Sequence, residues 1–335
     1  MQILRSVSLL LAFTLLLGFY SCRQTEHRFQ KTDISSIKKE AVHIHRYGKE
    51  LFSTDSKNLK TEIVNLNPEY HFFLGDTPDA ENNIQQLQEY LQDTILINLY
   101  KSVSEKYSDI TKIEKDLSKG FRYYRYHFPK KNIPKIYSFI SGIDFRYPIQ
   151  YYDSVMIISL DMYLGEDFEP YTQLRIPKYR SCDFTPEQIV PDCFLEIGDI
   201  TVPSTQSQTT FLDKILRKGK VLYFADAMLP TTPDSLKIKY STKQIKWCNN
   251  NEKLIWTYLI ENDLLFSTDY SLTRKLLSDG PFTSDFGTNS APRIGEWVGW
   301  QIIRSYMNKN PEIKLQQLIH NANSHDILKG SGYKP

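Results

Sequence analysis

The chain has 335 residues, of which 41 are lysine or arginine and 39 are aspartate or glutamate, so its formal net charge is +2 at pH 7. This balance supplies no general attraction for nucleic acid, and 41% hydrophobic with 24% charged residues predicts a folded chain and not a disordered one. The sequence has one long apolar stretch, which excludes a membrane protein with several spans.

The N-terminal segment predicts export and lipid attachment. Residues 6–20 form an apolar run that ends at Ser21-Cys22. The run has the length of a signal-peptide core and falls short of the roughly 20 residues that a membrane-spanning helix needs. A small residue followed by cysteine resembles a bacterial lipoprotein signal, although Phe19 and Tyr20 are bulkier than usual there. We expect cleavage before Cys22 and a covalent lipid on Cys22, with an ordinary secretory signal and an incidental cysteine as the alternative.

The expected organisation is a signal peptide over residues 1–21, a polar tether over 22–40 and one large domain over 41–335. An internal boundary near residue 130 is left open. The tether is rich in Lys, Gln, Ser and Thr and has few apolar side chains. Residues 67–79 are expected to form a loop, because Asn67-Pro68, Gly75 and Pro78 interrupt regular structure.

The middle of the chain predicts two helices and then two strands. Apolar residues recur every three or four positions over 81–107 and again from about 109 to 128, where Thr111 and Glu114 have capping-box spacing. Alternation over 135–145 and a β-rich run over 154–160 then predict two strands that pair.

The C-terminal half predicts mainly helices. Thr185-Pro186 begins one that runs towards Ile200, another spans about 209–227, and a third starts at Ser241, which has Gln244 at capping-box spacing. Two more are expected over 292–307 and 311–320. The predicted fold class is therefore α+β and helix-dominated: a helical hairpin, a small β-sheet and a helical layer.

The sequence contains none of the motifs HExxH, GxSxG, P-loop, GxGxxG or CxxC. His43 and His45 are the only close histidine pair, and surface histidines are favoured over a metal site because no third and fourth ligands lie nearby. We therefore expect no catalytic, cofactor-binding or metal-binding residue, and Cys22 as the lipid attachment site.

Several carboxylates leave alternatives open. Asp161 ends a predicted strand, where turn capping is favoured over catalysis. Asp192, Glu196 and Asp199 share one helix face, which could bind a cation or a basic partner, although an ordinary solvated face is favoured.

The glycines and cysteines also allow two interpretations each. Gly295 and Gly299 allow close helix packing, and the tryptophans beside them suit either an interface or, preferably, the core. Cys182 and Cys193 could form a disulfide, but three buried thiols including Cys248 are an equal alternative, with Cys193 expected to be packed and not reactive.

Short motifs spread over nearly the whole mature region resemble the gliding motility-associated lipoprotein family GldB. They are the Cys22 signal, Ile44-His45-Arg46-Tyr47, Ser159-Leu160-Asp161, Tyr163-Leu164-Gly165, Gly219-Lys220-Val221-Leu222-Tyr223, Leu229-Pro230, Trp247-Cys248, Pro281-Phe282, Arg293-Ile294-Gly295-Glu296-Trp297-Val298-Gly299-Trp300-Gln301 and Tyr333-Lys334-Pro335. The resemblance implies a role in the movement of certain bacteria over surfaces, within an envelope machinery linked to secretion of surface adhesins.

The order of elements is also similar to zinc-peptidase-like domains. These carry HExxH on one helix and Glu-Gly on the next, whereas here residues 189–196 contain no histidine and Lys218 precedes Gly219. This resemblance implies a degenerate zincin-like domain that has lost its metal.

The sequence thus predicts a non-enzymatic, lipid-anchored envelope protein that binds other proteins of the gliding and secretion machinery, with no cofactor beyond its lipid and no nucleic-acid partner. No aspartate follows Cys22, which favours the outer membrane, facing the periplasm. One alternative is a hydrolase with an unrecognised site around Asp161 and Glu196. Another is an envelope lipoprotein that binds peptides or glycans, suggested by the high aromatic content.

Overall fold

A computed structural model of the chain describes residues 28–204 and 209–335. The expected signal peptide and Cys22 lie outside the described residues. The chain divides into a unit that ends at Thr32, in which Arg28–Lys31 form the 3₁₀ helix η2, and a compact unit from Asp33 to Pro335. All that follows concerns the second unit.

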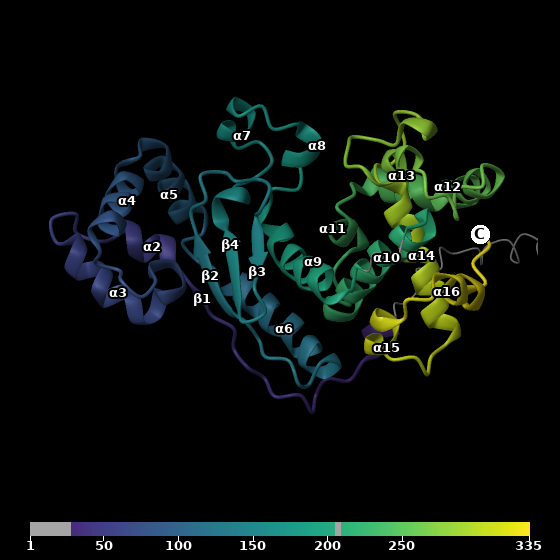
Figure 1. Cartoon of the computed structure of the whole chain (residues 1–335), viewed down its shortest axis with the longest axis horizontal. Helices are drawn as coiled ribbons and strands as arrows, with labels where there is room; N and C mark the ends of the chain where they lie inside the picture. Colours follow the sequence, from purple (N-terminus) through teal and green to yellow (C-terminus); the bar gives the residue numbers. More distant parts are fainter. Residues whose placement is uncertain (1–27, 205–208) are drawn as a thin grey trace, which may run out of the picture. The chain divides into compact units, whose positions relative to one another are not determined.

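Helices dominate this unit, as the sequence predicted, and a small sheet accompanies them (Figure 1). The helices are α2 (Tyr47–Phe52), α3 (Leu59–Leu74), α4 (Glu81–Gln92), α5 (Thr94–Lys106), α6 (Thr111–His127), α7 (Glu169–Gln173), α8 (Lys178–Ser181), α9 (Ile189–Thr201), α10 (Phe211–Met228), α11 (Asp234–Ile238), α12 (Thr242–Glu261), α13 (Tyr270–Leu277), α14 (Ile294–Lys309), α15 (Leu315–His320) and α16 (Ser324–Ser331), with 3₁₀ turns η3 (Leu160–Met162), η4 (Pro186–Gln188) and η5 (Ser284–Phe286). The strands are β1 (Ile44–His45), β2 (Lys135–Phe139), β3 (Ile149–Tyr151) and β4 (Val155–Ser159).

The four strands form one sheet in the order β1-β2-β4-β3. β2 and β4 pair in parallel, with Ile136 opposite Met156, so the predicted pairing of these two strands is confirmed. β1 also pairs in parallel with β2, and β3 is antiparallel to β4. β1 and β3 were not predicted, because two or three residues are too few to show a period of alternation.

Helices lie beside both edges of the sheet. Figure 1 shows α2 to α5 beside the β1 edge and α9 beside the β3 edge. α9 packs against β3 and also against α10, and therefore joins the sheet to the helical layer formed by α10 and α14.

The capping box predicted at Ser241 and Gln244 is confirmed at the start of α12. Thr210 and Asp213 form a second one at the start of α10, which the sequence did not predict, and each box has both reciprocal hydrogen bonds. These bonds satisfy backbone N–H groups that a helix start otherwise leaves unpaired.

The capping box predicted for α6 is wrong. The residue before α6 is Ile110, which makes no side-chain cap. The Glu114 carboxylate instead accepts a hydrogen bond from the backbone N–H of Ile44 at 2.9 Å and so ties α6 to β1.

The single helix expected over 81–107 is two helices. The break is at Asp93, whose backbone is extended (φ −65°, ψ 117°) and whose carboxylate accepts from the N–H groups of Ile95 and Leu96 at 2.7 and 3.2 Å. Aspartate caps a helix start better than it fills a helix interior, so local capping here overrides the apolar period.

The loop expected over 67–79 is wrong in its first half, because α3 continues to Leu74 with Pro68 inside it. The helix accommodates the proline with a kink at Tyr70 (φ −115°, ψ 27°). Tyr70 and Leu74 are each 6% exposed and pack in a cluster with Tyr137 of β2. Tertiary burial therefore outweighs the local cost of the proline.

The helices α10 and α14 touch through their backbones. A Cβ atom added to Gly299 would lie 1.8 Å from the carbonyl oxygen of Ile215, and one added to Gly219 would lie 2.4 Å from the carbonyl carbon of Gly299. Trp297 and Trp300 are 3% and 0% exposed. The core interpretation of this glycine and tryptophan region is confirmed.

A buried charge cluster joins the same two helices to α11. The Asp226 carboxylate of α10 is 1% exposed and accepts from Lys237 at 2.8 Å, from the Arg304 guanidinium at 2.8 and 2.9 Å, and from the indole N–H of Trp300 at 2.9 Å. Arg304 also binds both oxygens of Asp234. Because its charges are paired and hydrogen-bonded, the cluster is tolerated in the core.

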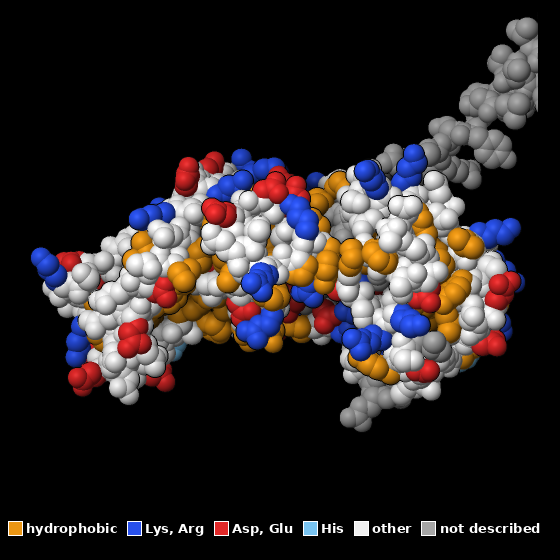
Figure 2. All heavy atoms as spheres, turned by 90° about the horizontal axis from the view of Figure 1, so that it is seen from above, with side chains coloured by type: hydrophobic (Ala, Val, Ile, Leu, Met, Phe, Trp, Pro, Cys, Tyr) orange, Lys and Arg blue, Asp and Glu red, His pale blue; other side chains and the backbone are white. Residues whose placement is uncertain are grey.

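Charges of both signs are spread among exposed hydrophobic side chains on the face that Figure 2 shows, in keeping with the small net charge. Among the described residues, no helix has both the length and the apolar character needed to cross a bilayer.

Candidate functional site

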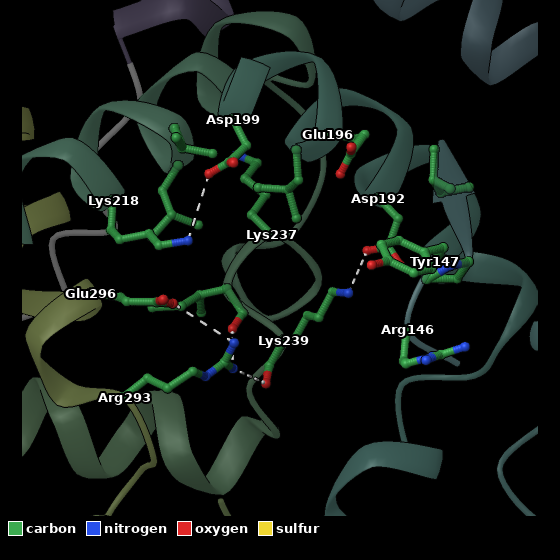
Figure 3. A pocket seen from close by; sticks show the side chains of 16 residues that line it. Arg146, Tyr147, Asp192, Glu196, Asp199, Lys218, Lys237, Lys239, Arg293 and Glu296 are labelled. Atoms are coloured by element: carbon green, nitrogen blue, oxygen red, sulfur yellow. Dashed lines mark hydrogen bonds and ion pairs between the residues drawn. The ribbon is translucent and has the colours of Figure 1, made fainter. Parts of the chain in front are cut away.

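A pocket of about 430 Å³ lies where the sheet meets the helical layer (Figure 3). Its volume is within the range of ordinary ligand sites. The lining comes from the segment entering β3, from α9, α10 and α11, and from the start of α14: Arg146, Tyr147, Pro148, Ile149, Asp192, Leu195, Glu196, Asp199, Lys218, Val221, Leu222, Lys237, Ile238, Lys239, Arg293 and Glu296.

The acidic face of α9 forms one wall of this pocket. Asp192, Glu196 and Asp199 share this face, as their spacing predicted. The favoured interpretation of an ordinary solvated face is wrong for Asp192, whose side chain is 7% exposed. Helix spacing alone could not show that β3 and α10 pack on either side of this face.

Asp192 is held by three donors. Its oxygens accept from the hydroxyl of Tyr163, the side-chain amide of Gln188 and the ammonium group of Lys239, each at 2.9 Å. A carboxylate so surrounded is fixed in position, and its charge is balanced by Lys239.

Asp199 is paired as well. Arg217 donates to its carboxylate at 2.9 Å, and the ammonium nitrogen of Lys218 lies 3.6 Å from the same oxygen. Lys218 therefore faces the pocket with a carboxylate partner of its own.

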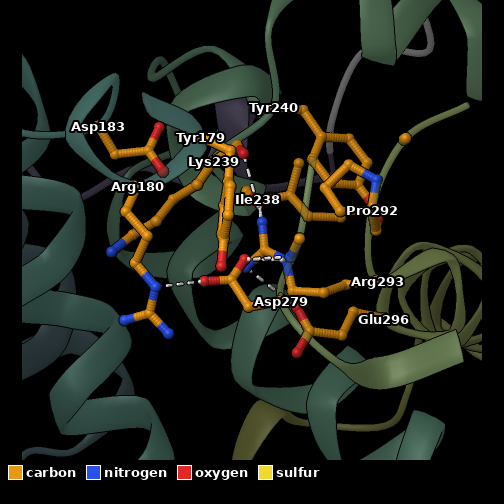
Figure 4. Close-up of polar contacts among 12 residues, drawn as sticks. Tyr179, Arg180, Asp183, Ile238, Lys239, Tyr240, Asp279, Pro292, Arg293 and Glu296 are labelled. Atoms are coloured by element: carbon orange, nitrogen blue, oxygen red, sulfur yellow. Dashed lines mark hydrogen bonds and ion pairs between the residues drawn. The ribbon is translucent and has the colours of Figure 1, made fainter. Parts of the chain in front are cut away.

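Arg293 fixes the opposite wall (Figure 4). Its backbone is left-handed (φ 47°, ψ 40°) at the start of α14, and its guanidinium donates to the carbonyl oxygens of Ile238 and Lys239 at 2.9 and 3.3 Å. Glu296 lies 3.7 Å from the same guanidinium, and so does Asp279. Arg293 thus ties the loop after α11 to α14 and neutralises Glu296.

Glu196 differs from the other carboxylates of the pocket. It has no hydrogen-bond or ion-pair partner among the described residues, and Figure 3 shows it on α9 between Asp192 and Asp199. Burial raises the pKa of Glu196, and the negative charges of Asp199 and Asp192 raise it further. A positive charge placed beside Glu196 would act in the opposite direction and lower its pKa.

Asp183 lies next to this site, near Lys239 and Arg293 (Figure 4). Burial raises its pKa from 3.8 to about 6, although the charges of Lys239 and Arg293 lower it. The folded state therefore binds a proton on Asp183 more tightly than the unfolded state does, and this contribution to stability is lost as the pH rises from about 4 to about 6.

We expect Asp183→Asn to remove this pH dependence. Between about pH 4 and pH 6, the free energy of unfolding of the variant should rise relative to that of the parent. Above about pH 6, the difference between the two should stay constant. Urea unfolding at a series of pH values measures the difference. A stability difference between variant and parent that does not change with pH would contradict the prediction.

Asp161 does not lie in the pocket. It is 0% exposed, and its oxygens accept from the backbone N–H groups of Ser141 and Ile143 and from the Ser141 hydroxyl at 2.7–2.9 Å. These bonds close the turn in which Ile143 is left-handed (φ 63°), so the capping interpretation is confirmed. The structure does not bring Asp161 and Glu196 together in this pocket.

The histidine pair sits on and beside β1. His45 Nδ1 lies 2.6 Å from Glu69, and the exposed His43 lies 3.9 Å from Glu114. Within residues 28–204 and 209–335, no group of three or more histidine, cysteine, aspartate or glutamate side chains is placed to hold a metal ion.

The three cysteines of the described chain are unpaired. Cys182 is exposed, so the alternative of three buried thiols is wrong for it, whereas Cys193 and Cys248 are buried. Burial raises the pKa of Cys193 well above its ordinary value, which agrees with a packed thiol and not a nucleophile.

The basic residues that line the pocket were not predicted from the sequence. Lys237, Lys239 and Arg293 are separated from α9 by many residues, and only the fold brings them to it. The one available indication was charge in an apolar context, as at Lys237, which lies between Leu236 and Ile238 and is 0% exposed.

Comparison with known proteins identifies one match. A family model named for GldB lipoproteins and described as gliding motility protein GldB matches residues 27–335. No curated protein and no solved structure matches the chain. The resemblance to zinc-peptidase-like domains therefore stays a prediction.

Proposed function

Because this match spans nearly the whole chain, the protein belongs to the family of gliding motility protein GldB, and we propose that it acts in gliding as a lipid-anchored, non-catalytic component of an envelope machinery. The family match carries the proposal. It covers every described element, including all residues that line the pocket.

Lipid attachment at Cys22 is the first part of the proposal. It is supported by the apolar run that ends at Ser21-Cys22 and by the lipoprotein name of the family. Two or more acyl chains on one cysteine hold a protein on a bilayer stably, whereas a single chain does not. The absence of an aspartate after Cys22 favours the outer membrane, with the folded body in the periplasm.

A supporting and not a catalytic role is the second part. Four of the five carboxylates that could act as acid or base are engaged in structural contacts: Asp161 closes a buried turn, and Asp192, Asp199 and Glu296 are each paired with a cation. The fifth, Glu196, has no partner in the described chain and no second free carboxylate of the lining to act with. We propose that the body binds other proteins of the gliding and secretion machinery.

We expect deletion of the gene to abolish spreading over a surface, and a wild-type copy to restore it. A copy carrying Cys22→Ala should not restore it, because the protein can no longer accept its lipid. Labelled palmitate should be lost from this variant, and the protein should leave the membrane fraction. Single-cell tracking measures the movement.

The matched control is Cys182→Ala, which removes an exposed thiol of the folded body. It should keep the label, the membrane fraction and the movement. Normal gliding of the deletion strain would refute the role in motility, and unchanged fractionation of Cys22→Ala would refute the anchor.

A further inference from the structure

We propose that the pocket between α9, β3 and α14 receives one basic side chain of a partner polypeptide, whose positive charge pairs with Glu196. The identity of the partner as a machinery component rests on the proposed function. The binding chemistry rests on the pocket alone.

The charge balance of the pocket is the first argument. Each cation of the lining has a carboxylate partner within 4 Å: Lys237 with Asp226, Lys239 with Asp192, Lys218 with Asp199, Arg293 with Glu296, and Arg146 with Asp144. Among the carboxylates of the lining, Glu196 has no such partner in the described chain. Within the described chain, Glu196 is therefore the carboxylate of the lining that remains for a cation from outside.

The position of Glu196 is the second argument. The two nearest basic residues of the lining, Lys218 and Lys239, are bound to the carboxylates one turn away on either side. Moving Lys239 to Glu196 would leave Asp192 without its cation, whereas Lys218 shares Asp199 with Arg217. A cation supplied by a partner can therefore pair with Glu196 without breaking the ion pairs of Asp192 and Asp199.

The walls beside Glu196 are the third argument. Ile149, Leu195, Val221 and Leu222 line the same space, and Tyr147, which is 58% exposed, stands at its edge. Lysine and arginine carry an aliphatic stem that packs on apolar surface while the charged end reaches a carboxylate. A volume of about 430 Å³ holds such a side chain together with part of its backbone.

Other ligand classes fit less well. An anion finds no unpaired cation in the lining, and a metal ion finds no group of three ligands in the described chain. A single positive charge on an aliphatic stem satisfies both the free carboxylate and the apolar walls.

The experiment titrates the full mature lipoprotein, purified in detergent, with acetyl-Gly-Lys-Gly-amide in a calorimeter. Matched peptides carry norleucine or acetyl-lysine in place of lysine, which removes the charge without altering the protein. We expect the lysine peptide to bind at least about tenfold more tightly than either neutral peptide, because a charged partner strengthens a hydrogen bond by this order.

The protein variant is Glu196→Gln, which keeps the shape of the side chain and removes its charge. It should lose the preference for lysine. The control is Glu187→Gln, an exposed residue just before α9 that lies outside this pocket. It should bind as the parent does.

Three results would overturn the proposal: no binding of the lysine peptide to the parent, equal binding of the neutral peptides, or an undiminished preference for lysine in Glu196→Gln. If Glu196→Gln does not fold, comparing the lysine peptide with the neutral peptides on the parent protein still tests the proposal. The role in gliding is tested separately by Cys22→Ala, so a failure of one proposal is not a failure of the other.

Discussion

Replacing Asp226 with asparagine is expected to lower the free energy of unfolding by about 3–5 kcal/mol, the cost of removing one partner from a buried ion pair. The amide keeps the shape of the carboxylate but removes the charge that lies 2.8 Å from Lys237, which is 0% exposed and has its other carboxylate neighbour, Asp234, at 3.8 Å. Arg304 keeps its two bonds to Asp234, so the loss falls mainly on Lys237 and on the contact between α10 and α11.

Chemical denaturation at neutral pH measures this effect. Burial opposes ionisation of Asp226, but the charges of Arg304 and Lys237 outweigh it and lower the pKa of the carboxyl group. The stabilisation is therefore complete at neutral pH and is lost only as the pH falls below the ordinary range of aspartate. The parent and variant should converge in strong acid.

The control for Asp226→Asn is Asp116→Asn. Asp116 forms an exposed pair with Lys112 one turn away on α6, at 2.9 Å. Exposed pairs of this kind contribute about 0–1 kcal/mol. An equal loss in the two variants would mean that the buried cluster adds nothing beyond surface charge.

Replacing Gly299 with alanine is expected to cost about 3 kcal/mol, at the upper end of the range for overpacking. In an unconstrained helix the same change would stabilise by up to about 1 kcal/mol. Here the new Cβ would meet the carbonyl oxygen of Ile215 at 1.8 Å. Because that atom belongs to the backbone of α10, the two helices must separate to relieve the contact.

The control for Gly299→Ala is Gly198→Ala on α9. A Cβ there would meet the ring of Phe224 at 3.0 Å, a contact with a side chain that a shift of a few tenths of an ångström relieves without moving either backbone. Urea denaturation should show a clearly smaller loss for Gly198→Ala. Equal losses would show that the backbone contact between α10 and α14 is not what makes Gly299 necessary.

The sequence predicted those parts of the fold that depend on neighbours along the chain. The cap of α12 involves residues three positions apart, and β2 and β4 lie in continuous stretches of strand-forming residues. Two of the failures have a different cause. The kink that allows Pro68 inside α3 and the bond from Ile44 to Glu114 depend on packing between distant segments.

The site was predictable only in part for the same reason. The spacing of Asp192, Glu196 and Asp199 placed them on one face, because a helix repeats every 3.6 residues. That this face would form one wall of a pocket, with Lys239 paired to Asp192 and Arg293 on the opposite wall, depends on the tertiary fold. A pattern within one helix carries no information about which loop closes over it.

The buried cluster around Asp226 also constrains the order in which the chain can fold. Its carboxylate is supplied by α10, but Arg304 and Trp300 belong to α14, which ends at Lys309 of 335 residues. A growing chain that has been synthesised only through α12 holds Asp226 without its main cation and exposes the glycine face of α10. The helical layer can therefore close only once α14 is present beside α10, and until then its apolar surface stays exposed to other chains.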